Sequence, residues 1–252
     1  MSPGDGFRTS QDPDPELVAG GRPSRAARPE GQPFRHDPSM TIPWWAVAAA
    51  AAAPVLLIGG FLLATAVQPA TYDPVRDTIS ALAEHGAVDS WLMTSAIAGV
   101  GLCYLLAALG LQPAGRIGRV LLAGGGVTTL LIAAFRVPRH GYSLPHELAV
   151  IATALTCCTW PAFASRRPPP ARLLARAPSF LATGVLLGLA AWYTLESHGP
   201  LLGIAERCAA AAPPLWLLAV AVTTRRARAR RSSKWSSKRR RLGSPVKASW
   251  KA

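Results

Sequence analysis

Long apolar blocks, almost free of charged residues, alternate along this chain with short connections that carry most of the charge. Each block is close to the roughly 20 residues that an α-helix needs to cross about 30 Å of hydrocarbon. The buried helices of a soluble bundle would keep a polar face, which these blocks lack. Since a central Lys, Arg or Asp costs about 2.5–3.5 kcal/mol on membrane insertion, the segregation predicts transmembrane helices.

The blocks predict an all-α integral membrane bundle of six transmembrane helices. They cover about residues 42–67, 91–111, 118–135, 146–164, 179–195 and 201–223. The Pro213–Pro214 pair predicts a break in the sixth helix. Ala64-Thr65-Ala66 is similar to a signal-peptidase site, but the long leader and apolar run favour an uncleaved helix. Small residues suited to close helix contacts are Gly99, Gly101, Gly124, Gly125, Gly126, Gly184 and Gly188.

Two tails flank the membrane domain, which we place at residues 41–224. Residues 1–40 are rich in Pro, Gly, Asp and Arg without apolar periodicity, which predicts a disordered segment. Residues 225–252 predict a second disordered tail, which carries 12 Lys and Arg residues and no acidic residue. Nucleic acid is one class of partner for such a tail. A tail tethered under a bilayer meets anionic lipid headgroups first, so we expect lipid rather than nucleic acid.

The distribution of Lys and Arg predicts the orientation. With the amino terminus inside, the cytoplasmic segments contain 23 of these residues and the outer segments three, namely Arg76, Arg136 and Arg139. We therefore expect a multi-pass protein of the inner (plasma) membrane with both termini in the cytoplasm. Four of the five histidines fall on the outer side, so a functional site is expected there.

The connection after the first span predicts a short amphipathic helix at the outer interface. Asp73 before Pro74 is a typical helix start, and Gly86 is a plausible end. At 100° per residue, Asp73, Asp77 and Ser80 fall on one polar stripe that also includes Glu84. This edge either contributes to a site or is simply solvated.

Ionisable residues near the fourth and sixth spans complete the candidate site. His146 stands at the start of the fourth span, where we expect it to reach Asp77 or Ser80. Glu206 and Arg207 lie inside the sixth span, where ionisable residues are costly and usually paired or functional. We expect Arg207 to pair with Glu206 or Asp77, and a purely structural ion pair is the alternative.

No motif in the chain predicts a metal or other cofactor. His140 and His146 are six residues apart with Gly141 and Pro145 between them, so they cannot form the i, i+4 pair of a helical zinc site. The chain contains no HExxH, GxSxG or phosphate-binding loop. The four cysteines lie in apolar blocks without paired CxxC spacing, which predicts small apolar fillers.

Several segments resemble the bacterial membrane family called domain of unknown function 998. They are Tyr72-Asp73-Pro74-Val75-Arg76-Asp77-Thr78-Ile79-Ser80-Ala81-Leu82, Asp89-Ser90-Trp91-Leu92-Met93-Thr94, Ala134-Phe135, Ser143 with His146, Trp160-Pro161, Gly203-Ile204-Ala205-Glu206-Arg207 and Leu215-Trp216. The resemblance covers about residues 44–223 and implies a multi-helix membrane bundle without an established activity. Arg136 stands where the family tends to have proline.

Two classes of function remain open. One is a small transporter or membrane scaffold with a polar outward-facing site, favoured by the charged pair and proline pair of the sixth span. The other is a membrane-embedded hydrolase acting on lipid or cell-envelope substrates, favoured by the Ser, Asp and His residues gathered on one side.

Overall fold

The computed structural model describes residues 42–138 and 143–242, and within them the chain is all α-helical. Six helices are long and apolar enough to cross a membrane, which confirms the predicted integral membrane bundle. The predicted tail of residues 1–40, together with Arg139, His140 and residues 243–252, lies outside the described residues. The long helices are α1 (Trp44–Ala66), α3 (Ser90–Gly110), α4 (Gly115–Ala134), α5 (Leu144–Ala164), α6 (Arg176–Leu195) and α7 (Leu202–Leu242).

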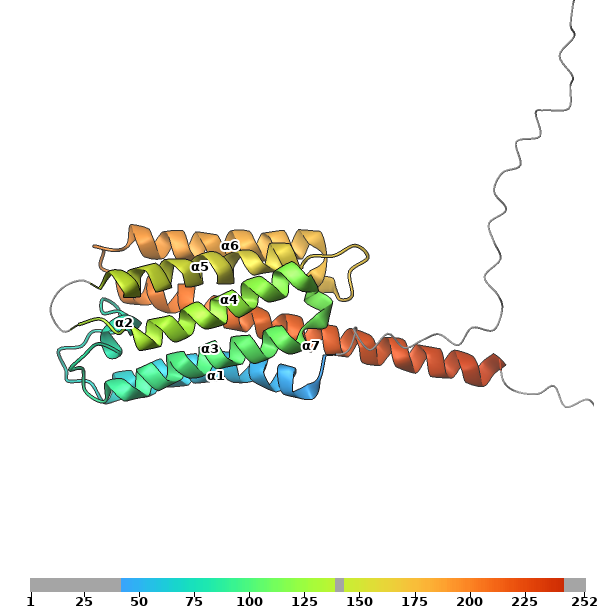
Figure 1. Cartoon of the computed structure of the whole chain (residues 1–252), viewed down its shortest axis with the longest axis horizontal. Coiled ribbons are helices and arrows are strands. Elements are labelled where there is room, and N and C mark those ends of the chain that lie inside the picture. Colours follow the sequence, from blue (N-terminus) through green and yellow to red (C-terminus); the bar gives the residue numbers. More distant parts are fainter. Residues whose placement is uncertain (1–41, 139–142, 243–252) are drawn as a thin grey trace, which may run out of the picture. The chain divides into compact units, whose positions relative to one another are not determined.

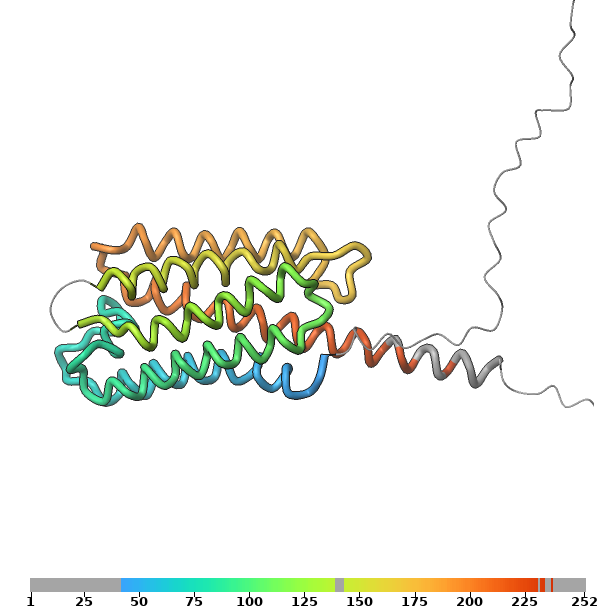
Figure 2. Tube along the Cα trace, viewed as in Figure 1, coloured from blue at the N-terminus to red at the C-terminus, as the bar shows by residue number. Residues whose placement is uncertain are grey.

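The six long helices pack as a ring in chain order. Each contacts its neighbour in the sequence, and α7 returns to α1 to close the ring. Short connections explain this order, because consecutive antiparallel helices are usually neighbours in space. One end of the ring carries the short helix α2 (Ile79–Leu82), and α7 continues beyond the other end (Figures 1 and 2). We call these the α2 end and the opposite end.

Close approaches between the ring helices depend on glycine. A Cβ atom on Gly126 of α4 would lie 2.8 Å from the Gly101 carbonyl oxygen of α3. Membrane helices gain little from the hydrophobic effect, so small residues that let backbones approach supply much of the contact. Gly184 and Gly188 of α6 differ from this prediction, since a Cβ atom on either would meet nothing within 4 Å.

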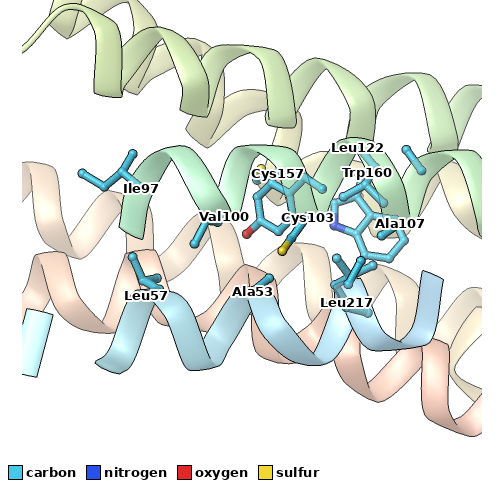
Figure 3. Close-up of a cluster of buried hydrophobic side chains, with 14 of the residues drawn as sticks. Ala53, Leu57, Ile97, Val100, Cys103, Ala107, Leu122, Cys157, Trp160 and Leu217 are labelled. Carbon is cyan, nitrogen blue, oxygen red and sulfur yellow. The ribbon is translucent and has the colours of Figure 1, made fainter. Parts of the chain in front are cut away.

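The interior of the ring is filled toward the opposite end. Trp160 is 1% exposed and packs in one buried cluster with Leu122, Ala107 and Leu217, which come from three other helices (Figure 3). Replacing a fully buried Trp by Ala typically costs about 3–5 kcal/mol. This cluster therefore holds α3, α4, α5 and α7 together from within.

Helix α7 differs from the sequence analysis in two respects. It runs through Pro213 and Pro214 as one helix, and it continues to Leu242, where residues 225–242 had been expected to be disordered. No Gly or Pro occurs between Pro214 and Gly243. Arg, Lys and Ala are good helix formers, and an existing helix extends without a new nucleation cost.

The predicted amphipathic helix of residues 73–86 is much shorter in the structure. The amide of Asp77 donates to the carbonyl oxygen of Asp73 at 2.7 Å, which closes a single turn. Helix α2 then begins after Thr78, whose hydroxyl accepts a hydrogen bond from the amide of Ala81 at 3.0 Å. The carbonyls of Pro74 and Asp77 that a continuous helix would use are bound instead by Arg207 of α7.

Candidate functional site

Arg207 binds the connection between α1 and α2 through hydrogen bonds to its backbone. Its Nη1 donates to the carbonyl oxygens of Pro74 (2.7 Å), Asp77 (2.9 Å) and Gly203 (2.9 Å). Its Nη2 donates to the Tyr72 hydroxyl at 2.7 Å, and the guanidinium lies 5.7 Å from the centre of the Phe61 ring. These contacts join α7 to α1 and to the connection above it.

The expected ion pair of Arg207 is not formed. The backbone carbonyl oxygen of Asp77 accepts a hydrogen bond from the Arg207 guanidinium. The Asp77 carboxylate accepts a different one, from the amide of Asp73 at 2.7 Å. The ion pair that is present within the described ranges is a different one, between Arg76 and Asp73, whose Nε and Oδ2 atoms lie 3.7 Å apart on the exposed surface. Carbonyl dipoles and an aromatic face therefore stabilise the Arg207 charge in place of a carboxylate.

Tyr72 completes the binding of the guanidinium. Its hydroxyl accepts from Arg207 and donates to the carbonyl oxygen of Thr78 at 3.1 Å. Burial raises the pKa of Tyr72 above its ordinary value of 10.0, although the charge of Arg207 acts in the opposite direction. The hydroxyl therefore remains protonated and able to donate at neutral pH.

Gly203 lets α7 approach this connection. Its amide donates to the carbonyl oxygen of Val75 at 2.9 Å. A Cβ atom at Gly203 would lie 2.7 Å from the Pro74 carbonyl oxygen, and it would also collide with the carbonyl oxygen of Asp77. Any larger residue would push α7 away from the carbonyls that Arg207 binds.

Glu206 faces a different direction from Arg207, because adjacent helix positions differ by 100°. One carboxylate oxygen accepts from the backbone amide of Ile79, and the other accepts from the Ser80 hydroxyl at 2.9 Å. Both donors belong to α2. Glu206 thus connects α2 to α7 through Ile79 and Ser80.

A cavity of about 170 Å³ lies inside the ring next to Glu206. All six long helices and α2 contribute to its wall, which is mainly apolar. The polar side chains in the wall are Ser80, Tyr104, Thr129, Thr153, Tyr193 and Glu206. A mostly apolar pocket with a few polar groups is the usual form of a small-molecule site.

The polar side chains of the cavity wall differ in whether they form hydrogen bonds within the protein. Thr129 donates to the Gly125 carbonyl oxygen at 2.7 Å, and Thr153 donates to the Thr128 hydroxyl at 2.8 Å. Tyr104 is 4% exposed, and its hydroxyl has no hydrogen-bond partner within the described part of the chain. Tyr104 and Tyr193 were not among the predicted residues, since the only signal of each in the sequence is a phenol inside an apolar span.

His146 forms its hydrogen bonds with Ser143 and Phe135 rather than with the other candidate residues. It is buried, and its Nδ1 lies 2.9 Å from the carbonyl oxygen of Phe135 at the end of α4. Its amide donates to the Ser143 hydroxyl, the cap of α5, at 3.4 Å. The structure shows no hydrogen bond from His146 to Asp77 or Ser80 among the described residues.

The structure therefore brings together part of the predicted set. Ser80 and Glu206 share the cavity wall, whereas Arg207 and the backbone of Asp77 form a neighbouring structural contact. Asp73 lies at the exposed surface, in its ion pair with Arg76. In the described ranges, His, Cys, Asp and Glu side chains form no group of three that could hold a metal ion.

Comparison with known proteins gives one match. Neither a curated protein nor a solved structure matches the chain. A family model described as "Protein of unknown function (DUF998)" matches residues 45–223, which include all six long apolar helices up to the middle of α7. This match covers most of the chain, as the resemblance of the Tyr72–Leu82 and Gly203–Arg207 segments implied. The chain therefore belongs to the DUF998 family of proteins of unknown function.

Proposed function

We propose that this multi-pass membrane protein takes a small molecule into the cavity of its helix ring, as a binding protein or carrier rather than as a scaffold. The observation that carries the proposal is the cavity itself, which reaches all six long helices and holds Glu206 in an otherwise mainly apolar wall. A scaffold would have no need of a cavity with an ionisable group, because both reduce the stability of a bundle.

Helix α2 is suited to cover this cavity. Ile79 and Ser80 both line the cavity and both donate hydrogen bonds to Glu206. Movement of α2 would break these two contacts and expose Ile79 and Leu82, which are buried. We therefore infer that the ligand enters at the α2 end, by movement of this short helix.

Cysteine modification tests whether the cavity admits solutes. In a variant without the four native cysteines, Thr153→Cys places a thiol in the cavity wall and Leu155→Cys places one on the exposed outer surface of α5. Methyl methanethiosulfonate is small and uncharged, and it reacts with the thiolate form that requires water. We expect modification at residue 153 to be at least about tenfold faster than at residue 155, because only a thiol in contact with water forms the reactive thiolate. Equal, slow rates would favour a sealed scaffold.

One contact favours the second candidate, a membrane-embedded hydrolase. The Ser80 hydroxyl lies 2.9 Å from a Glu206 carboxylate oxygen, within reach for general-base activation of a serine nucleophile. Labelling by a fluorophosphonate probe that disappears in Ser80→Ala would support this candidate. Absence of labelling in the unmodified protein would count against it.

We further propose that the basic end of the chain binds anionic lipid headgroups. The support is the run of Arg and Lys residues from Arg225 onward, on a helix that leaves the membrane domain directly. Each basic residue near an anionic surface contributes about 1 kcal/mol.

The same charge distribution supports a location in the inner (plasma) membrane with both termini in the cytoplasm. An even number of spans puts both ends of the membrane domain on one side. The excess of Arg and Lys at the opposite end of the ring is the usual mark of the cytoplasmic side. On this proposal the α2 end faces outward.

A further inference from the structure

The carboxyl group of Glu206 accepts hydrogen bonds but forms no ion pair within the described ranges. Both of its oxygens accept hydrogen bonds, and both donors belong to α2. No Lys, Arg or His nitrogen in the described ranges lies within 4.0 Å of it, because Arg207 is bound to carbonyl oxygens and to Tyr72. A carboxyl group inside a membrane span is costly and usually paired, and Glu206 forms no ion pair among the described residues.

A second observation in the same cavity also indicates a ligand. The Tyr104 hydroxyl belongs to a side chain that is 4% exposed, yet it has no hydrogen-bond partner among the described residues. This hydroxyl is free to donate a hydrogen bond to a ligand in the cavity or to accept one from it. Tyr193 adds a second aromatic ring to the wall, and aromatic rings attract cations as well as apolar groups.

The size and lining of the cavity define the rest of the ligand. Leu57, Ile97 and Val100 are among the apolar side chains of the wall. The volume of about 170 Å³ compares with the roughly 150 Å³ in which an apolar protein cavity binds benzene. A ligand of this size has an apolar body close to one six-membered ring, with room for a single polar head.

We propose that the cavity binds a small organic cation, with an ammonium head paired to Glu206 and an apolar body of about one ring. The Tyr104 hydroxyl is then available for a second polar contact. This inference rests on the proposed function, because it names the class of ligand for the same cavity. It assigns Glu206 as the residue that selects for positive charge.

Three probes with the same ring and different charge test the inference. Benzylammonium, benzyl alcohol and benzoate are cationic, neutral and anionic, respectively, at pH 7. Binding is measured by equilibrium dialysis against the full-length protein in lipid nanodiscs, with empty nanodiscs subtracted to remove partitioning into lipid. We expect benzylammonium to bind at least about tenfold more tightly than benzyl alcohol, with benzoate weakest, as a charge-assisted contact implies.

Variants locate the selectivity. Glu206→Gln removes the charge but keeps a side-chain oxygen that accepts hydrogen bonds, and it should abolish the preference for benzylammonium over benzyl alcohol. Glu196→Gln, at the end of α6 and outside the cavity wall, should retain it. If Glu206→Gln does not fold, Tyr104→Phe provides a second test and should weaken benzylammonium binding severalfold.

The outcomes separate this inference from the proposed function. Preference for benzyl alcohol, equal binding of all three probes, or a cation preference that survives Glu206→Gln would overturn the inference. Binding of none of the probes would also overturn it, even where the thiol at residue 153 reacts and the proposed function therefore stands. An unreactive thiol at residue 153 would overturn the proposed function itself.

Discussion

Arg207 is an intramembrane arginine whose charge is distributed over backbone carbonyls. Three carbonyl oxygens and one hydroxyl accept its hydrogen bonds, and the Phe61 ring lies beside it. Arg suits this position better than Lys, since its planar guanidinium presents five donors in a fixed geometry. The neighbouring Glu206 does not take part in these hydrogen bonds and lines the cavity instead. Two adjacent ionisable residues thus have separate roles, one structural and one facing the proposed ligand.

Replacing Arg207 should destabilise the protein strongly. In Arg207→Ala the carbonyls of Pro74 and Asp77 and the Tyr72 hydroxyl lose their donor, and hydrogen bonds to charged groups contribute about 1.5–3 kcal/mol each. We expect a clear fall in folded yield and in Tm, measured after solubilisation in detergent. Arg76→Ala is the control, because an exposed ion pair contributes less than about 1 kcal/mol. Similar Tm values for the two variants would contradict this assignment.

The Tyr72 hydroxyl should make stability depend on pH under alkaline conditions. Burial raises its pKa in the folded state above the ordinary 10.0, so the folded protein holds this proton more tightly than the unfolded chain does. The resulting stabilisation is fully present below pH 10 and is lost as the pH rises through the folded pKa. Thermal unfolding at pH 8 and pH 11 should show a larger decrease for the unmodified protein than for Tyr72→Phe. An identical decrease would indicate that Tyr72 does not contribute.

At the level of helices, glycines with similar sequence surroundings have opposite roles. A Cβ atom at Gly203 would lie 2.7 Å from the Pro74 carbonyl oxygen, whereas at Gly184 it would meet nothing within 4 Å. Gly203→Ala should therefore lower Tm by displacing α7 from the connection. Gly184→Ala should leave Tm unchanged or raise it, because Ala is favoured over Gly in helices by up to about 1 kcal/mol. The reverse order of Tm values would show that α7 does not approach the connection closely.

The basic end of α7 should bind anionic membranes through charge. A peptide of residues 225–252 should sediment with vesicles that contain phosphatidylglycerol but not with pure phosphatidylcholine, since the peptide has no acidic residue to offset its charge. Exposed charges are screened beyond about 8 Å at physiological ionic strength and beyond about 3 Å at 1 M salt, so salt should release the peptide. A peptide with Gln at every Lys and Arg position is the control. Equal sedimentation with both kinds of vesicle would remove the proposal.

The helices were more predictable than the contacts of the connection between α1 and α2. Span length and the absence of charge identified all six helices, and they placed both ends of the first five and the start of α7 within about three residues, because the bilayer imposes both properties. The carbonyls that bind Arg207 left no sequence signal, since every residue has a carbonyl group. These carbonyls also interrupt the helix that the Asp73, Asp77 and Ser80 spacing had predicted. The high charge of residues 225–242 likewise favoured the wrong prediction of a disordered segment. These helix-forming residues follow a helix that is already formed, so α7 continues through them.

At the scale of the whole molecule, the ring explains how distant residues reach one cavity. Ser80, Tyr104, Tyr193 and Glu206 come from four elements, and only closure of α7 against α1 places them around one space. Sequence analysis could identify Glu206, because a carboxylate within an apolar span is unusual. Whether a tyrosine faces lipid or the interior depends on helix rotation, which a nearly uniform apolar span does not encode. The cavity therefore required the packed structure.

The charges at the two ends of the ring predict its orientation in the membrane. The two ends of the ring differ in charge. The connections at the α2 end carry few basic residues, whereas the opposite end has Arg116 and Arg119 at the start of α4 and the arginines between α5 and α6. Basic residues resist translocation, so the opposite end should remain in the cytoplasm. Alkaline phosphatase, which is active only outside the cytoplasm, should be active when fused after Asp89 or Gly199 and inactive after Gly115 or Pro169. A fluorescent protein at the same four positions should give the opposite pattern. Phosphatase activity after Gly115 would reverse the orientation and place the cavity cover, α2, on the cytoplasmic side.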